Sequence, residues 1–199
     1  MSADLARVRV VVVTWNSAGH VARAVASVPA PTRVVVVDNA SSDGSADEAE
    51  QAGAVVLRLP SNAGFGPACN VGASRVDGLP DAEALLFLNP DAALVDGPSA
   101  LAALLAELDA DPGVAAVAPA LLGDGQEEFQ LRTLPTLGSL AREAFLVNRL
   151  FPSNRGFRRE RYLDRDRTRP FDVEQPAAAA LLVRREAFER VGGFDPAFA

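Results

Sequence analysis

The chain has 199 residues, about half of them apolar, and its 19 basic and 26 acidic side chains give a formal net charge of −7. This composition is that of an ordinary globular protein, and the length suits one domain with its own core. The negative charge argues against nucleic acid as a partner, because that affinity comes largely from neutralised phosphates. One cysteine and one histidine exclude an intrachain disulfide and a Cys/His zinc cluster, so a bound metal must use oxygen ligands.

The first 120 residues alternate short β-branched apolar runs with longer mixed segments. Continuous apolar runs are typical of parallel strands covered on both faces, because both sets of side chains are then buried. The expected strands are residues 8–13, 34–37, 55–59, 85–88 and 114–117, and the expected helices are residues 19–28, 44–52, 66–76 and 98–108. This order predicts an α/β fold, with a mostly parallel sheet flanked by helices in a single domain.

The pattern changes after Pro119. We expect a helix over residues 135–150, an arginine-rich stretch over 155–169, and a last strand and helix over 178–183 and 184–191. The arginine-rich stretch has seven arginines against three acidic residues, which indicates either a solvated face or a surface for an anionic partner such as a phosphorylated acceptor or a membrane. The amino terminus lacks the order of a secretory signal and no apolar run spans a bilayer, so we expect a cytoplasmic protein, with peripheral contact with the inner face of the membrane left open.

Polar side chains follow each of the first four expected strands. The segments are Thr14-Trp15-Asn16-Ser17, Asp38 to Ser45, Ser61 to Gly66, and Asn89-Pro90-Asp91. Each alone is explained by helix caps and turns, and Trp15 is more simply explained by packing than by stacking on a base. Together they favour a ligand site, because ligands of open α/β sheets bind at the carboxyl ends of the strands.

Two common nucleotide sites do not fit this sequence. A dinucleotide site needs G-x-G-x-x-G directly after the first strand, but the G-x-G here is Gly64-Phe65-Gly66, after the third. A P-loop needs a lysine, and the chain contains none. A nicotinamide dehydrogenase and a P-loop NTPase are therefore not expected.

Five ordered motifs carry a resemblance to a known family: VVVTWNS, VVVVDNASSDGS, NAGFGPACNVG, LLFLNPDA and ALLVRREAFERVGGFD. They resemble the family 2 glycosyltransferases with the Rossmann-like GT-A fold, close to the rhamnosyltransferase-like branch. The resemblance runs from Val8 to Phe198 and implies one such domain over residues 1–199. In it, residues 1–120 or so bind the donor, while an insertion and the start of the acceptor part occupy about 121–199.

The resemblance also implies an activity. The protein would move a sugar, with inversion, from a nucleotide-diphosphate sugar to a glycan or lipid-linked acceptor. The expected donor is dTDP-rhamnose or a UDP-sugar, and the expected process is the synthesis of cell-wall or surface polysaccharide.

Roles for individual residues follow from the same resemblance. Thr14 and Asn16 would line the nucleotide pocket, and Asp38 would contact the base or lie beside the ribose. The residues expected in the loop and helix that close over the donor are Asn62, Gly64 and Asn70.

The resemblance implies a metal site as well. Asn89-Pro90-Asp91 takes the place of the D-x-D motif, with Asp91 as the ligand of Mg²⁺ or Mn²⁺. Such a cation stabilises the charge of the leaving nucleoside diphosphate. Asn89 stands where many relatives have aspartate, so the sequence predicts a weakly held metal beside the donor.

The general base is not found among these motifs. In relatives, an acidic pair follows the Gly-Gly-Phe-Asp element within about ten residues, whereas this chain ends at Ala199. We therefore expect the base beyond Ala199, and donor binding with little transfer from these 199 residues. Asp195 is a weaker candidate, since it is explained equally well as a turn residue before Pro196.

Three other kinds of protein remain open. A nucleotidyltransferase would also use a carboxylate and a metal, but it would need a glycine-rich, basic loop near the amino terminus. A non-catalytic module that binds sugar nucleotides fits the missing acidic pair. An interaction scaffold would leave the polar ends of the strands unexplained.

Overall fold

The computed structural model describes residues 2–123, 131–146, 150–151 and 154–198. The chain forms two compact units, one of Met1–Pro119 with Ala178–Ala199 and one of Ala120–Ala177. The second unit lies within the part of the sequence where we expected an insertion. The assignment of residues 1–199 to one domain of the family stays a prediction.

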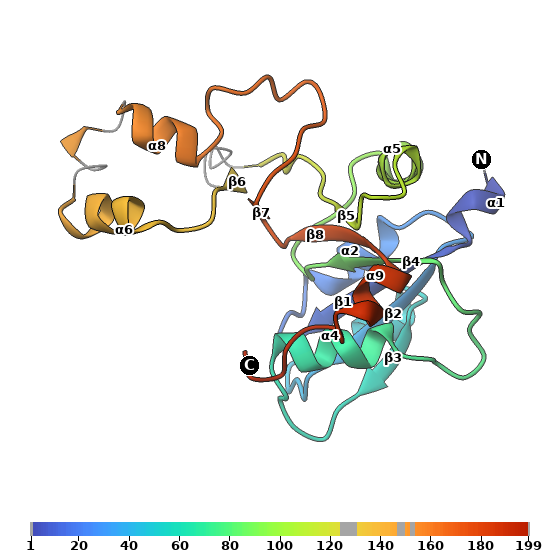
Figure 1. Cartoon of the computed structure of the whole chain (residues 1–199). Coiled ribbons are helices and arrows are strands. Elements are labelled where there is room, and N and C mark those ends of the chain that lie inside the picture. The colour runs from blue at the N-terminus through green and yellow to red at the C-terminus, as the bar shows by residue number, and fades with distance from the viewer. Residues whose placement is uncertain (1, 124–130, 147–149, 152–153, 199) are drawn as a thin grey trace. The chain divides into compact units, whose positions relative to one another are not determined.

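A six-stranded sheet forms the centre of the first unit, with the strand order β3-β2-β1-β4-β8-β5 (Figure 1). Its strands are β1 (Val8–Thr14), β2 (Arg33–Asp38), β3 (Val55–Arg58), β4 (Ala84–Leu88), β5 (Ala116–Val117) and β8 (Ala180–Arg184). The first four are parallel, while β8 runs antiparallel to β4 and pairs with β5. The prediction of a mostly parallel α/β sheet is confirmed.

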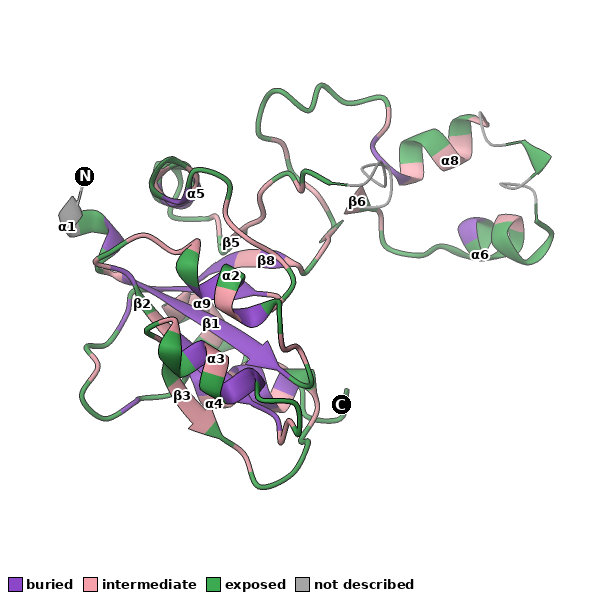
Figure 2. Ribbon diagram, turned by 180° about the vertical axis from the view of Figure 1, so that it is seen from behind, coloured by how far each residue is buried: buried purple, intermediate pink, exposed green. Residues whose placement is uncertain are grey.

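Helices cover both faces of this sheet. The helices are α1 (Ser2–Leu5), α2 (Val21–Ala26), α3 (Ser45–Gln51), α4 (Phe65–Ala73), α5 (Gly97–Ala110) and α9 (Arg185–Arg190). Val10 and Val12 pack in one apolar cluster with α2, α3 and α5, whereas Val11 and Val13 pack in a second cluster with α4 and α9. Alternate residues of a strand point to opposite faces, so the valine run of β1 is buried on both sides (Figure 2).

Gly72 allows α4 to lie close against β1. A Cβ atom at this position would be 2.4 Å from Cγ1 of Val11, so no larger residue fits without movement of the helix. The close packing fixes the position of α4 and therefore of the loop that leads into it.

The strand register brings the polar strand ends to one edge. Thr14 lies opposite Asp38, and Val12 lies opposite Leu88. The ends of β1, β2 and β4 therefore meet at the same side of the sheet, which we call the carboxyl edge.

Two arginines lie at the opposite, amino edge of the sheet. The buried Arg9 donates hydrogen bonds to the carbonyl oxygens of Ser74 (2.5 Å) and Pro80 (3.0 Å), and Arg185 donates to that of Ala73 (2.9 Å). Burial, with a smaller contribution from Arg185, lowers the pKa of Arg9. These guanidinium groups hold the loop after α4 against the sheet.

Among the residues that the structure describes, the second unit contains the short helices α6 and α8 and a two-stranded ribbon. Its elements are β6 (Leu131–Arg132), α6 (Leu137–Ala144), α8 (Arg155–Glu160) and β7 (Gln175–Pro176). Thr136 and Ser139 form a capping box at the start of α6, and Arg142 joins α6 to α8 through an ion pair with Glu160 at 3.1 Å. The helix that we expected over 135–150 ends at Ala144, and residues 147–149 of that range lie outside the described residues. None of the described helices has the length and apolar character to cross a membrane.

Candidate functional site

The loop after β1 is bound to the loop after β2 by an unbroken series of hydrogen bonds. The N–H groups of four consecutive residues, 16–19, each donate to a side-chain oxygen of the segment 41–48. The pairs are Asn16 with Ser41 (3.0 Å), Ser17 with Ser45 (2.8 Å), Ala18 with Asp43 (2.9 Å) and Gly19 with Glu48 (2.8 Å). The SSDGSADE segment thus fixes the backbone that follows β1.

Asn16 strengthens this connection in the other direction. Its backbone has a φ of 50°, a left-handed conformation that asparagine tolerates better than most residues. Its side-chain oxygen accepts the N–H of Ser42 at 2.9 Å. The structure places Asn16 at the carboxyl edge, where its hydrogen bonds join the two loops.

Asp43 is held in its ionised form by the same contacts. The Ser45 hydroxyl, and then the Ala18 N–H, lower the pKa of Asp43 by donating hydrogen bonds to its carboxylate. From the sequence, we expected Asp43 only as a helix cap or a turn residue. Six of the eight side chains in segment 41–48 carry oxygen, and this density was the signal for its wider role.

Thr14 and Asp38 lie side by side at the ends of β1 and β2, both buried. The Thr14 hydroxyl has no hydrogen-bond partner within the described part of the chain. Both carboxylate oxygens of Asp38 lie 3.3 Å from the N–H of Ser41, which donates to them. A buried hydroxyl without a partner costs about 1–3 kcal/mol, and such groups in native proteins call for an explanation such as a role in a site.

Trp15, next to this pair, is 57% exposed. The packing interpretation of this residue is therefore wrong. Trp15 lies between Thr14 and Asn16 at the carboxyl edge. Because its side chain is exposed there, the ring is free to stack on a flat ligand.

Asn39 holds the glycine-rich loop, a role that the sequence analysis missed. Its side chain is buried, donates to the carbonyl of Gly64 (3.2 Å) and accepts the N–H of Ala63 (2.8 Å). Asn62 adds a local bond by accepting the N–H of Gly64 at 2.9 Å. An amide can donate and accept at once, so Asn39 joins the loop that begins α4 to the end of β2.

Asn70 binds a distant part of the chain. Its side chain accepts the N–H of Phe194 at 2.9 Å and donates to the carbonyl of the same residue at 2.8 Å. Gly193 is required beside it, because its φ is 80° and a Cβ there would lie 2.6 Å from the Asn70 oxygen. The structure thus uses the Asn70 amide to join α4 to the Gly-Gly-Phe element.

The turn after β4 places a carboxylate in solvent. Asn89 donates its N–H to the carbonyl of Ala179 (2.9 Å), and Arg23 of α2 donates to the backbone carbonyl of Asp91 (2.9 Å). The turn is thus fixed through its backbone. The exposed Asp91 carboxylate has no hydrogen-bond or ion-pair partner among the residues that the structure describes.

The oxygen donors at this turn suit a metal ion that is held jointly by the protein and a bound diphosphate. Within the described ranges, no group of three or more His, Cys, Asp or Glu side chains could hold a cation. A single carboxylate oxygen with a neighbouring amide still matches Mg²⁺, which commonly takes one or two carboxylates and completes its shell with substrate phosphates and water. The residues therefore fit a cation that arrives with a diphosphate.

Asp195 lies in the turn that follows the Gly-Gly-Phe element. Its carboxylate accepts the N–H of Ala197 at 2.9 Å and is otherwise exposed. From the sequence, Asp195 was either a weak candidate for the base or a turn residue. This contact is the one expected of a turn residue.

A cavity of about 670 Å³ lies along α4 and α9 rather than at the carboxyl edge. Its charged lining consists of Arg75, Arg185, Asp81 and Glu189, so the two signs are balanced. The polar residues after the strands, and not this cavity, form the candidate site.

The sequence is similar to a known protein family and to a curated relative. Residues 9–192 match the family described as Glycosyl transferase family 2. An N-acetylglucosaminyl-diphospho-decaprenol L-rhamnosyltransferase of Mycobacterium tuberculosis is 32% identical over 203 residues, which cover 94% of this chain and 64% of the relative. The chain thus spans less than two thirds of the length of the curated relatives that it matches.

Solved structures agree on the fold. A mannosyltransferase from Pyrobaculum calidifontis, in complex with GDP-Man and Mn²⁺, has a TM-score of 0.59 at 21% identity over 96% of this chain and 48% of its own. The glucosyl-3-phosphoglycerate synthase of Mycobacterium tuberculosis, in complex with Mn²⁺, UDP and glucosyl-3-phosphoglycerate, has a TM-score of 0.54 at 19% identity over 90% of this chain and 57% of its own. These likenesses confirm the GT-A fold, and the family match covers most of the sequence. The chain belongs to glycosyl transferase family 2.

Proposed function

We propose that this chain binds a nucleotide-diphosphate sugar at the carboxyl edge and belongs to a glycosyltransferase that passes the sugar to a glycan or lipid-linked acceptor. The observation that carries the proposal is the Asp91 carboxylate, which is exposed and has no partner among the described residues. It follows β4 at the same edge of the sheet where Thr14 and Asp38 lie. The family and the named rhamnosyltransferase relative support this activity.

The nucleotide lies at the ends of β1 and β2. Thr14 and Asp38 supply polar contacts to the base or ribose, and Trp15 offers a ring for stacking. Asn16 and Asn39 act on this site through the loops that they hold. The loop at Asn62 and Gly64 closes over the donor, and Asn70 positions the Gly-Gly-Phe element beside it.

Asp91 holds a divalent cation, Mg²⁺ or Mn²⁺, with Asn89 beside it. When bound, the cation neutralises the charge that builds up on the leaving nucleoside diphosphate. The Mn²⁺ complexes of the two structural relatives support a divalent cation in this role. The amide of Asn89 contributes a neutral oxygen where a second carboxylate would bind the cation more strongly.

The donor is dTDP-rhamnose or a UDP-sugar, and the acceptor is lipid-linked, in the synthesis of cell-wall or surface polysaccharide on the cytoplasmic side of the membrane. The rhamnosyltransferase relative, whose name includes a diphospho-decaprenol, supports a rhamnose donor and a lipid-linked acceptor. Inversion needs a carboxylate base opposite the leaving group. Its expected position beyond Ala199 stays a prediction.

Calorimetry with dTDP and UDP, each with and without Mn²⁺, tests the donor site. We expect Mn²⁺ to tighten nucleotide binding, and we expect Asp91→Asn to remove that increase. Asp96→Asn is the matched control, because Asp96 is an exposed carboxylate of the same β4–α5 connection. Nucleotide binding that is equal with and without Mn²⁺ in all three proteins would contradict the proposal.

A non-catalytic module that binds sugar nucleotides is a second candidate. The Asp195 contact with Ala197 favours it, because this carboxylate serves a turn. A transfer assay with dTDP-rhamnose and a lipid-linked acceptor tests this candidate. Product formation by the chain rejects the module, whereas nucleotide binding without product is the result that both candidates predict for these 199 residues.

A further inference from the structure

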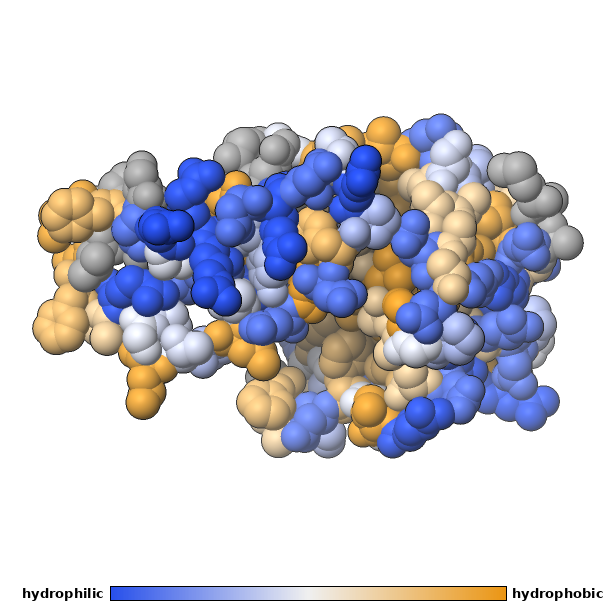
Figure 3. Space-filling view, turned by 45° about the horizontal axis from the view of Figure 1, so that its top comes forward, coloured by the Kyte–Doolittle hydropathy of each residue, from blue (hydrophilic) through white to orange (hydrophobic). Residues whose placement is uncertain are grey.

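The second unit exposes an unusual group of large apolar side chains. Six of them lie on α6 and in the segment between α6 and α8, and each is more than half exposed. They are Leu137, Leu140, Phe145, Leu146, Leu150 and Phe151, which we call the apolar edge. Single exposed apolar residues are common, but a group of six within 15 residues marks an interaction surface. In Figure 3 the orange and pale orange side chains of this unit gather at one end of it.

The aromatic contacts found among the described residues of the second unit do not involve these side chains. Tyr162 is buried and packs on Phe171 with their ring centroids 5.8 Å apart, and Arg161 lies over the ring of Phe157 at 5.5 Å. Phe157 faces this interior from α8. The apolar edge is therefore an addition to the packed part of the unit.

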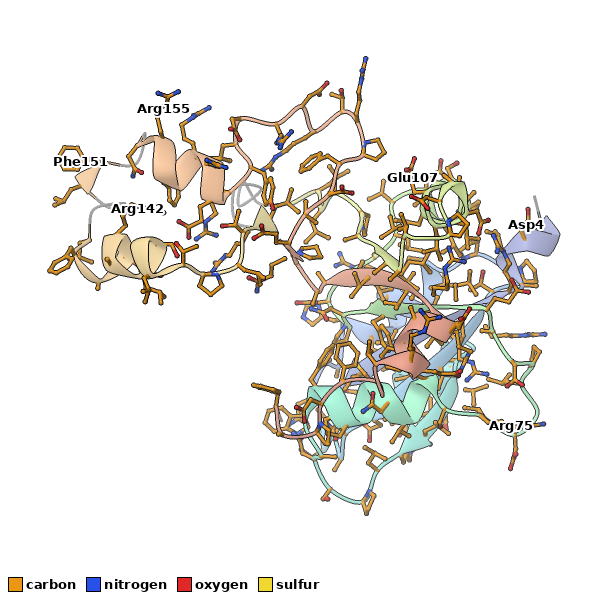
Figure 4. The ribbon with its side chains drawn as sticks, viewed as in Figure 1. Asp4, Arg75, Glu107, Arg142, Phe151 and Arg155 are labelled. Carbon is orange, nitrogen blue, oxygen red and sulfur yellow. The ribbon has the colours of Figure 1, made fainter. Side chains whose placement is uncertain are left out.

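Positive charge accompanies the apolar edge. Residues 155–169 contain seven arginines and three acidic residues, and the guanidinium-bearing residues of α8, Arg155, Arg158 and Arg159, are exposed. One of the acids, Glu160, is already paired with Arg142. Phe151 and Arg155 lie toward the same end of the α6–α8 pair, whereas Arg142 lies between the helices (Figure 4). Aromatic and leucine side chains and exposed cations thus share one part of the unit.

We propose that the apolar edge and the arginines of α8 form a docking surface for a bilayer that contains anionic phospholipids. Leucine and phenylalanine side chains would enter the boundary between headgroups and acyl chains, and the arginines would bind lipid phosphates. A guanidinium group suits this role because its fork of donors matches a phosphate. The purpose of the surface rests on the proposed function, since it would bring the donor site to a lipid-linked acceptor.

Vesicle co-sedimentation of the full chain tests the surface. The probes are vesicles of phosphatidylcholine alone and vesicles with about one third phosphatidylglycerol. We expect the chain to bind the anionic vesicles, and to bind them less as salt screens the arginines. We expect the pair Phe145→Ser and Phe151→Ser to lower the affinity about tenfold, because two phenyl rings no longer enter the lipid.

The charge component has its own matched variants. Arg155→Ser, Arg158→Ser and Arg159→Ser together should lower binding to anionic vesicles at least about tenfold and weaken its salt dependence. The control combines Arg33→Ser, Arg75→Ser and Arg190→Ser, which change the net charge equally at exposed positions of the first unit. Val95→Ser with Val191→Ser is the control for loss of exposed apolar residues. Both controls should bind vesicles as the unchanged chain does.

Several results would overturn the proposal. They are no binding to anionic vesicles, equal losses in the variants and their controls, or a dimer in sedimentation velocity that the phenylalanine variant abolishes while vesicles remain unbound. Nucleotide calorimetry on the same proteins keeps the two proposals apart. Intact nucleotide binding without vesicle binding rejects the docking surface alone, and vesicle binding without nucleotide binding rejects the donor site alone.

Discussion

The two edges of the central sheet are both polar, but their polar groups are used differently. At the amino edge, Arg9 and Arg185 direct their donors at backbone carbonyls of the chain itself. At the carboxyl edge, side chains also hold the loops, yet the Asp91 carboxylate remains exposed without a partner in the described chain. A polar edge therefore indicates a ligand site only where polar groups remain without a hydrogen-bond or ion-pair partner in the folded chain.

The largest effect on stability should come from the amino edge. Arg185→Ala removes the charged donor that binds the carbonyls of Ala73 and Ala82, and it leaves both with fewer partners. We expect the free energy of unfolding to fall by about 3 kcal/mol, measured by urea denaturation. Nucleotide affinity should stay within about twofold at temperatures where the variant is folded. A loss of affinity in the fully folded variant would show that the two edges are not functionally separate.

Substitutions of Asn39 test whether the side chains that hold the loops of the carboxyl edge contribute to nucleotide binding. Asn39→Ala removes the bonds to Ala63 and Gly64, and we expect a loss of about 2 kcal/mol of stability and about tenfold in nucleotide affinity. Asn39→Asp keeps the acceptor and loses the donor, so its losses should be smaller. Equal affinity in all three proteins would contradict a positioning role for Asn39.

A smaller effect should follow acidification. The pKa of Asp43 is lower in the folded chain than in the unfolded chain, where it is about 3.9. Its stabilising contribution is therefore complete above that value and is lost as the pH falls toward the folded pKa. Asp43→Asn should make the thermal midpoint less dependent on pH between about 5 and 3, as followed by circular dichroism. An unchanged pH dependence would show that this carboxylate does not link the two loops.

The local sequence pattern was sufficient to predict where the strands of the central sheet lie. Continuous valine and leucine runs report burial on both faces, so the strand expected at 85–88 is found at Ala84–Leu88 and the one expected at 34–37 at Arg33–Asp38. The pairing of β8 between β4 and β5 could not be read in this way, because it joins segments that are far apart in the sequence.

The candidate site was only partly predictable for a related reason. The position of Thr14 and Asp38 at one edge follows from the strand order, and the structure confirms it. The partner of Asn70 lies 124 residues away, and the partners of Asn39 lie about 25 residues away, so neither bond leaves a local pattern. Trp15 was misread because the sequence does not reveal that its loop turns into solvent.

The central claim is that Asp91 binds the divalent cation of the donor complex. Electron paramagnetic resonance of Mn²⁺ in the presence of UDP measures this directly, because the signal of free Mn²⁺ decreases when the ion binds to protein. We expect a nucleotide-dependent decrease for the unchanged chain and for Asp96→Asn, and a loss of about tenfold or more in Mn²⁺ affinity for Asp91→Asn. The same Mn²⁺ affinity in Asp91→Asn and in the unchanged chain would contradict it.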